Sequence, residues 1–209
     1  MTLRLHSAKR ASAPFRVRIA LHLKGVPFEL VSVNLVAGEQ GGPAYDRLNR
    51  QHLVPTLETP DGPLTQSLAI MEWLEETHPE PPLLPREPFA RARVRSVADV
   101  IACDIHPINN LRITKALGAL GVDQPGVAAW SRHWITDGLA ALEPIVAEHG
   151  RGFAIGDTPT LADCCLVPQL YNARRFDTDL TPYPSLLAVE ARALAHPAFH
   201  AAHPDQHPD

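Results

Sequence analysis

The sequence lacks the features that mark several classes of protein. Its 209 residues contain no apolar run as long as a membrane span and no apolar leader near the start, so we expect neither a membrane helix nor a secretory signal. The net charge of −4 offers no basic surface for nucleic acid. The 11 histidines show no metal-ligand spacing such as His-Glu-x-x-His, so no metal site is predicted from a motif.

Cysteine is scarce as well. Cys103, Cys164 and Cys165 are the only three, and the adjacent pair point to different faces of a predicted helix, which argues against a disulfide framework. We predict that all three pack as small apolar side chains in the reducing cytoplasm.

The C-terminal tail is rich in proline and histidine. We interpret it as a solvated segment, with a metal site as the less favoured alternative. Its histidines are His196, His200, His203 and His207.

What the chain does contain is enough apolar residues, 45%, for a packed core. The first part alternates strand patterns (residues 3–6, 28–33, 54–58 and around 64) with helical patterns (14–24, 45–48 and 67–77). Four prolines in residues 79–86 indicate a stiff linker. Only helical patterns follow it, at 89–105, 127–148, 161–175 and 184–195. We therefore predict an α/β domain over 1–80, a linker over 81–87 and an all-α domain over 88–209.

The bend after the first strand is a candidate anion site. Small residues and one hydroxyl, Ser12, lead into a helix whose apolar positions include Val17, Ala20 and Leu21. A helix N-terminus presents free N–H groups and the positive end of a dipole, which suits an anion such as a thiolate. Ser12 is interpreted either as the helix cap or as a group that activates a thiol.

Two further motifs precede or begin regular elements. A cis bond at Val54-Pro55 would expose the Val54 backbone to a peptide ligand, whereas a trans bond would be an ordinary strand start. Ser67, after Gln66, is interpreted as a helix cap, and a carboxylate site is the alternative.

Three other polar clusters have structural interpretations beside functional ones. Thr160 to Asp163 fits a loose capping box. Arg174 and Arg175 either interact with a helix C-terminus or clamp an anion. Residues 104–110 form a polar helix break in which His106 is a candidate general base.

Taken together, these motifs resemble the zeta class of glutathione transferases over nearly the whole chain. Each block alone is weakly specific, but their order and spacing together are highly specific. They include Arg16-Val17-Arg18-Ile19-Ala20-Leu21, Leu53-Val54-Pro55-Thr56-Leu57, Gln66-Ser67-Leu68-Ala69-Ile70, Cys103-Asp104-Ile105-His106-Pro107, Leu161-Ala162-Asp163 and Asp179-Leu180-Thr181-Pro182-Tyr183-Pro184.

The resemblance implies a thioredoxin-like N-terminal domain, an all-helical C-terminal domain, a homodimer and glutathione as cofactor. It favours the cis form of Val54-Pro55 and assigns the γ-glutamyl group to Gln66 and Ser67. The remaining residues implied to contact glutathione are Ser12, Gln40, His52, Val54, Asp104, His106 and Asn110, the last three partly from a neighbouring subunit. Arg10 and Arg175 match basic positions that hold substrate carboxylates.

The implied activity is cis–trans isomerisation of maleylacetoacetate in aromatic catabolism, with Ser12, Arg10 and Arg175 as the catalytic residues. Maleylpyruvate isomerisation, glutathione transfer to α-haloacids and non-catalytic glutathione binding are the alternatives. Leu111, where some maleylpyruvate isomerases carry arginine, modestly favours maleylacetoacetate. One departure stands out, because the family begins its motif with two small polar residues and this chain has Ala11 at the first.

Overall fold

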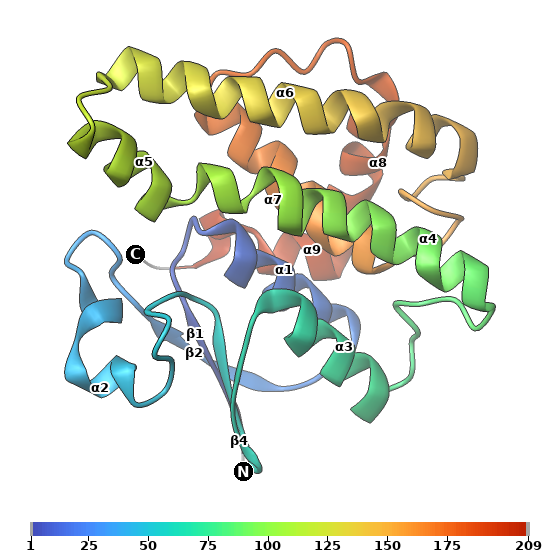
Figure 1. Ribbon diagram of the computed structural model, residues 1–209. Coiled ribbons are helices and arrows are strands. Elements are labelled where there is room, and N and C mark those ends of the chain that lie inside the picture. Colours follow the sequence, from blue (N-terminus) through green and yellow to red (C-terminus); the bar gives the residue numbers. More distant parts are fainter. Residues whose placement is uncertain (1, 208–209) are drawn as a thin grey trace. The chain divides into compact units, whose positions relative to one another are not determined.

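The computed structural model describes residues 2–207 and divides the chain into two compact units (Figure 1). The first unit contains the residues up to Leu83 together with those from Leu194 onward, and the second contains Leu84–Ala193. Within the described residues, no helix combines the length and apolar character needed to span a bilayer.

The first unit is built on a mixed four-stranded sheet with the order β2-β1-β3-β4. Strand β1 pairs with β2 in parallel and with β3 antiparallel, and β3 and β4 form a hairpin. This topology confirms the predicted thioredoxin-like domain. Its elements are β1 (Leu3–Ser7), α1 (Ser12–Leu23), β2 (Phe28–Ser32), η1 (Glu39–Gly41), α2 (Pro43–Asp46), β3 (Thr56–Thr59), β4 (Gly62–Thr65), α3 (Ser67–Thr77), α9 (Pro197–Ala202) and η4 (Pro204–Gln206).

Helices α1 and α3 pack against each other, and α1 also packs on β1. Their shared core includes the fully buried Leu5, Ile19, Leu57 and Ile70. Helix α1 stops where the sequence predicts, because Gly25 has a φ of 63°, a left-handed conformation that residues with a Cβ rarely adopt.

The interpretation of the C-terminal tail as solvated was wrong. Helix α9 packs on α1 with Phe199 fully buried, and the buried Arg18 donates from Nε to the carbonyl of Ala202 at 3.0 Å. Ala198, Phe199 and Ala202 recur at helical spacing, so a short apolar stripe buries itself despite the surrounding prolines and histidines.

The second unit is all helical, as predicted. Helix α5 was missed, and the predicted helix over 89–105 changes to a π-helix at η2, where Cys103 is exposed rather than packed. Cys164 and Cys165 are buried, as expected. The elements are α4 (Pro88–Asp99), η2 (Val100–Ile105), η3 (Pro107–Asn109), α5 (Leu111–Ala119), α6 (Gln124–His149), α7 (Leu161–Arg175) and α8 (Pro184–Leu194).

Candidate functional site

Helix α1 begins without a side-chain cap. Its N-cap residue is Ala11, with extended backbone (φ −76°, ψ 129°) and no side-chain hydrogen bond. Ser12 is the first helical residue and is only 3% exposed. The interpretation of Ser12 as the cap was therefore wrong, because the residue with non-helical backbone lies one position earlier. The first N–H groups of α1 are left to other acceptors.

Helix α3 begins in a similar way. The N-cap residue is Gln66, whose φ is 69° and whose side chain does not cap the helix, so the assignment of Ser67 as the cap was also wrong. The Gln66 carboxamide instead donates from Nε2 to Oε1 of Gln51 at 2.8 Å. Buried Ser67 accepts a hydrogen bond at Oγ from Nη1 of Arg16, at 3.2 Å.

Strand pairing brings these helix starts to one edge of the sheet. Thr56 of β3 pairs with His6 near the end of β1 and with Thr65 at the end of β4. The bend before α1, the Val54-Pro55 bond before β3 and Gln66 after β4 therefore converge. The Val54-Pro55 bond is cis, the form that the family resemblance favours.

The segment before Pro55 is held by buried polar side chains. Tyr45 Oη and Asn49 Nδ2 each donate to the carbonyl of Leu53 at 2.7 Å. His52 has a φ of 55°, and its Nε2 lies 2.8 Å from Oδ1 of Asp46. These contacts set the course of the backbone that presents Val54.

Gln40 is the one predicted glutathione contact that carries a buried polar atom in need of a partner. It lies on η1, which packs against α2. Within residues 2–207, nothing hydrogen-bonds to its buried Oε1. Burying an amide oxygen without a donor is unfavourable, so this atom fits a site that a ligand completes.

The remaining predicted site residues are distributed between the two units. Arg10 is exposed in the bend before α1. Asp104 is exposed on the π-helix, and Asn110 accepts at Oδ1 from the backbone of Arg112 at 3.1 Å, which caps α5. His106 is half-buried at the end of η2. Their roles toward glutathione stay predictions.

The two arginines at the end of α7 differ. Arg174 makes a bidentate ion pair with the nearly buried Glu190, with Nη1–Oε1 and Nη2–Oε2 distances of 2.6 and 2.5 Å. Arg174 is therefore paired with a carboxylate of α8, a partner that the interpretation as a cation at the helix C-terminus did not include. Arg175 is exposed on the same turn and keeps its predicted role as an anion-binding residue.

Sequence reasoning missed Arg16. This side chain is 1% exposed, although arginine is seldom fully buried. The only local signal is its place one helical turn after Ser12, on the same face of α1. Its contact with Ser67 joins residues 51 positions apart, which helical periodicity does not report.

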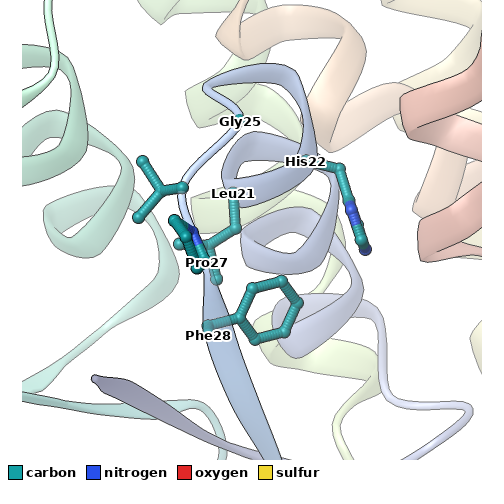
Figure 2. Close-up of a pocket in the computed structure, with 6 residues that line it drawn as sticks. Leu21, His22, Gly25, Pro27 and Phe28 are labelled. Atoms are coloured by element: carbon teal, nitrogen blue, oxygen red, sulfur yellow. The ribbon is translucent and has the colours of Figure 1, made fainter.

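A separate pocket of about 350 Å³ lies at the other end of α1 (Figure 2). Leu21, His22, Gly25 and Phe28 line it, close to the end of α1 and the start of β2. It is therefore distinct from the edge where α1 begins. The part of the chain that the structure describes also contains no group of three metal-ligating side chains.

Comparison with known proteins places these features in one family. Residues 12–82 match the model of the glutathione S-transferase N-terminal domain. The chain is 47% identical to a maleylpyruvate isomerase from Ralstonia sp. over 99% of both chains, and 45% identical to a maleylacetoacetate isomerase from Pseudomonas aeruginosa over 99% and 98%.

Solved structures agree with the sequence relatives. A holo maleylpyruvate isomerase, described as a bacterial zeta-class glutathione S-transferase, is 47% identical with a TM-score of 0.96 over 99% of both chains. A maleylacetoacetate isomerase from Anaeromyxobacter dehalogenans, with glutathione bound in its active site, is 48% identical with a TM-score of 0.90, over 100% of this chain and 97% of the other.

Proposed function

The chain belongs to the zeta-class glutathione transferases and is a glutathione-dependent isomerase of that class, and we propose that it converts maleylacetoacetate to fumarylacetoacetate. The observation that carries this proposal is the convergence of two uncapped helix N-termini and the cis Val54-Pro55 bond at one edge of the sheet. One helix start suits a thiolate and the other suits a carboxylate.

The residues present fit glutathione. Gln66 and Ser67 would hold the γ-glutamyl group at the start of α3, and Val54 would pair with the peptide backbone. Gln40, whose buried Oε1 needs a donor, and His52 would contact the rest of the tripeptide. Asp104, His106 and Asn110 would add contacts to glutathione that the family resemblance implies, partly from a neighbouring subunit.

Glutathione supplies the thiolate that adds to the cis double bond and leaves again after rotation about the resulting single bond. With glutathione bound, Ser12 would donate a hydrogen bond to the sulfur and the N-terminus of α1 would add its dipole, which together would lower the pKa of the thiol. Arg10 and Arg175 hold the carboxylate-bearing ends of the substrate and stabilise the negative charge that develops on it.

The proposal extends to the assembly and the location of the protein. A homodimer in the cytoplasm follows from the family resemblance. The reducing cytoplasm also suits an exposed thiol such as that of Cys103.

Maleylpyruvate is the second candidate substrate. It is favoured by the relative and the solved structure with that name, at 47% identity each. Leu111, 43% exposed at the start of α5, is the residue that argues for maleylacetoacetate. Both substrates carry a cis double bond between an acid and a ketone, so the same chemistry serves either.

The test follows loss of each cis acid with and without glutathione, and records the glutathione concentration. We expect glutathione-dependent isomerisation at constant glutathione, with maleylacetoacetate the faster substrate. Consumption of glutathione would indicate a conjugating transferase, and no turnover of either acid would contradict the proposal. Ser96→Ala is the matched control for the Ser12→Ala variant, because the Ser96 hydroxyl lies exposed on α4 and donates to the carbonyl of Arg93.

A further inference from the structure

Arg16 contacts the proposed cofactor site from the protein interior. Its side chain reaches from α1 to the first residue of α3, where Nη1 lies 3.2 Å from Oγ of Ser67. Arg16 is 1% exposed and Ser67 is 6% exposed, so the contact lies inside the protein. Neither the predicted site nor the proposed chemistry has used this arginine.

The direction of this hydrogen bond is set by chemistry. A guanidinium carries only donors, and it stays protonated in proteins. The oxygen of Ser67 must therefore accept, which leaves the single hydroxyl proton of Ser67 for another acceptor. A hydroxyl that accepts from a cation is also a stronger donor, because the positive charge polarises it.

The start of α3 also favours a negatively charged acceptor. The Gln66 side chain does not cap this helix. Free N–H groups and the helix dipole at that point favour a negatively charged acceptor. Arg16 adds a full positive charge in a water-poor environment, where charge interactions are stronger than in bulk water.

We propose that Arg16 is a positioning residue that aims the Ser67 hydroxyl and makes cofactor binding depend on the α-carboxylate of the γ-glutamyl group. This inference rests on the proposed function, since it concerns the same cofactor. Arg16 acts through Ser67, whose hydroxyl its positive charge polarises, so its removal lowers selectivity for that carboxylate.

The test compares two ligands by calorimetric titration. One is glutathione, and the other is 4-aminobutyryl-cysteinyl-glycine, which lacks only the α-carboxylate. We expect the wild type to prefer glutathione, and Arg16→Gln to reduce that preference about tenfold or more, as expected for loss of a charge-assisted contact. Arg16→Lys, which keeps the charge, should restore part of the preference.

A double-mutant cycle tests whether Arg16 works through Ser67. The combined Arg16→Gln and Ser67→Ala variant should lose little more preference than Ser67→Ala alone. If the losses of preference in the two single variants multiply in the double variant, or if Arg16→Gln keeps the wild-type preference, the inference is overturned while the proposed function stays intact. A wild type that binds neither ligand would overturn both.

Folding is checked separately because Arg16 is buried. Far-UV circular dichroism and thermal melts accompany each variant. If Arg16→Gln does not fold, Ser67→Ala and Ser67→Thr decide, because both keep Arg16 and only the second keeps a hydroxyl. A carboxylate preference that survives in Ser67→Ala would then overturn the inference.

Discussion

The start of α7 and the starts of α1 and α3 satisfy their backbone groups in opposite ways. At α7, Asp163 is fully buried and accepts from the backbone of Ala154 at 2.7 Å and from the backbone and hydroxyl of Thr160, both at 2.8 Å. This confirms the predicted capping box. At α1 and α3, the N-cap residues Ala11 and Gln66 contribute no side-chain cap.

On the proposed function, the difference separates a helix end that serves stability from two helix ends that bind the cofactor. A cap supplied by the chain itself stabilises the helix whatever is bound. An end without such a cap is less stable alone, and its N–H groups remain able to bind an anion. Changes at α7 should therefore reduce stability, and changes at α1 should mainly reduce activity.

The largest expected effect is on stability, at α7. Asp163→Ala leaves two buried N–H groups and one hydroxyl without their acceptor, which should lower the free energy of unfolding by about 4 kcal/mol. Urea unfolding measures this loss. Asp163→Asn keeps one acceptor oxygen and should lose less. A change below about 1 kcal/mol in Asp163→Ala would show that the box does not carry the stability we assign to it.

The next effect concerns pH at the same residue. Burial raises the pKa of Asp163 from 3.8 to about 6, and it outweighs the hydrogen bonds that lower the pKa. A raised pKa means that the folded state holds the proton more tightly than the unfolded state. The stabilisation is therefore complete below the unfolded pKa and is lost as the pH rises through the folded one.

Between pH 4 and pH 6.5 we expect the free energy of unfolding to fall by about 2 kcal/mol relative to Asp163→Asn. Urea titrations at several pH values compare the two proteins. Parallel pH profiles for wild type and Asp163→Asn would mean that another group titrates.

The third effect is on catalysis, at α1. Ser12→Ala removes the proposed donor to the bound thiolate, so the isomerisation rate should fall by about 10- to 100-fold. The thiol pKa should rise, and the pH–rate profile should move to higher pH. Urea unfolding should change little, because alanine suits a first helical position. A wild-type rate in Ser12→Ala would exclude Ser12 as the donor.

The smallest effect comes from adding a cap to α1. Ala11→Ser places a hydroxyl at the N-cap, which should stabilise the protein by about 1 kcal/mol and raise Tm by roughly 2–4 °C. Ala13→Ser adds the same hydroxyl inside the first turn and serves as the control. Equal melting temperatures for the two variants would show that the start of α1 gains nothing from a side-chain cap.

Local patterns predicted the regular elements well. The bounds of α3 and α7 coincide with the helical patterns over 67–77 and 161–175. Apolar residues recur at helical spacing in both helices, and this signal depends only on neighbouring residues. The convergence of the site could also be anticipated from the family resemblance, because the order of its motifs is specific.

The prediction failed where one residue's role depends on a distant one. Ser12 and Ser67 are of a residue type that is common at N-caps, but each lies one position inside its helix. The sequence predicted a solvated C-terminal tail, but the apolar side chains of α9 pack on α1. The buried Arg16 gave almost no signal in the sequence.

By itself, the sequence determined an α/β part and an all-helical part, because periodicity is a local property of the chain. Its resemblance to the zeta class added the thioredoxin-like fold, the family and the cofactor, because the order of motifs along the chain is specific. Only the tertiary structure decided which residue holds Ser67, which backbone carbonyl Arg18 bonds and which helix starts lack a cap. The physical reason is that a buried donor is paired by whatever acceptor folding brings within about 3 Å of it, however far apart the two lie along the chain.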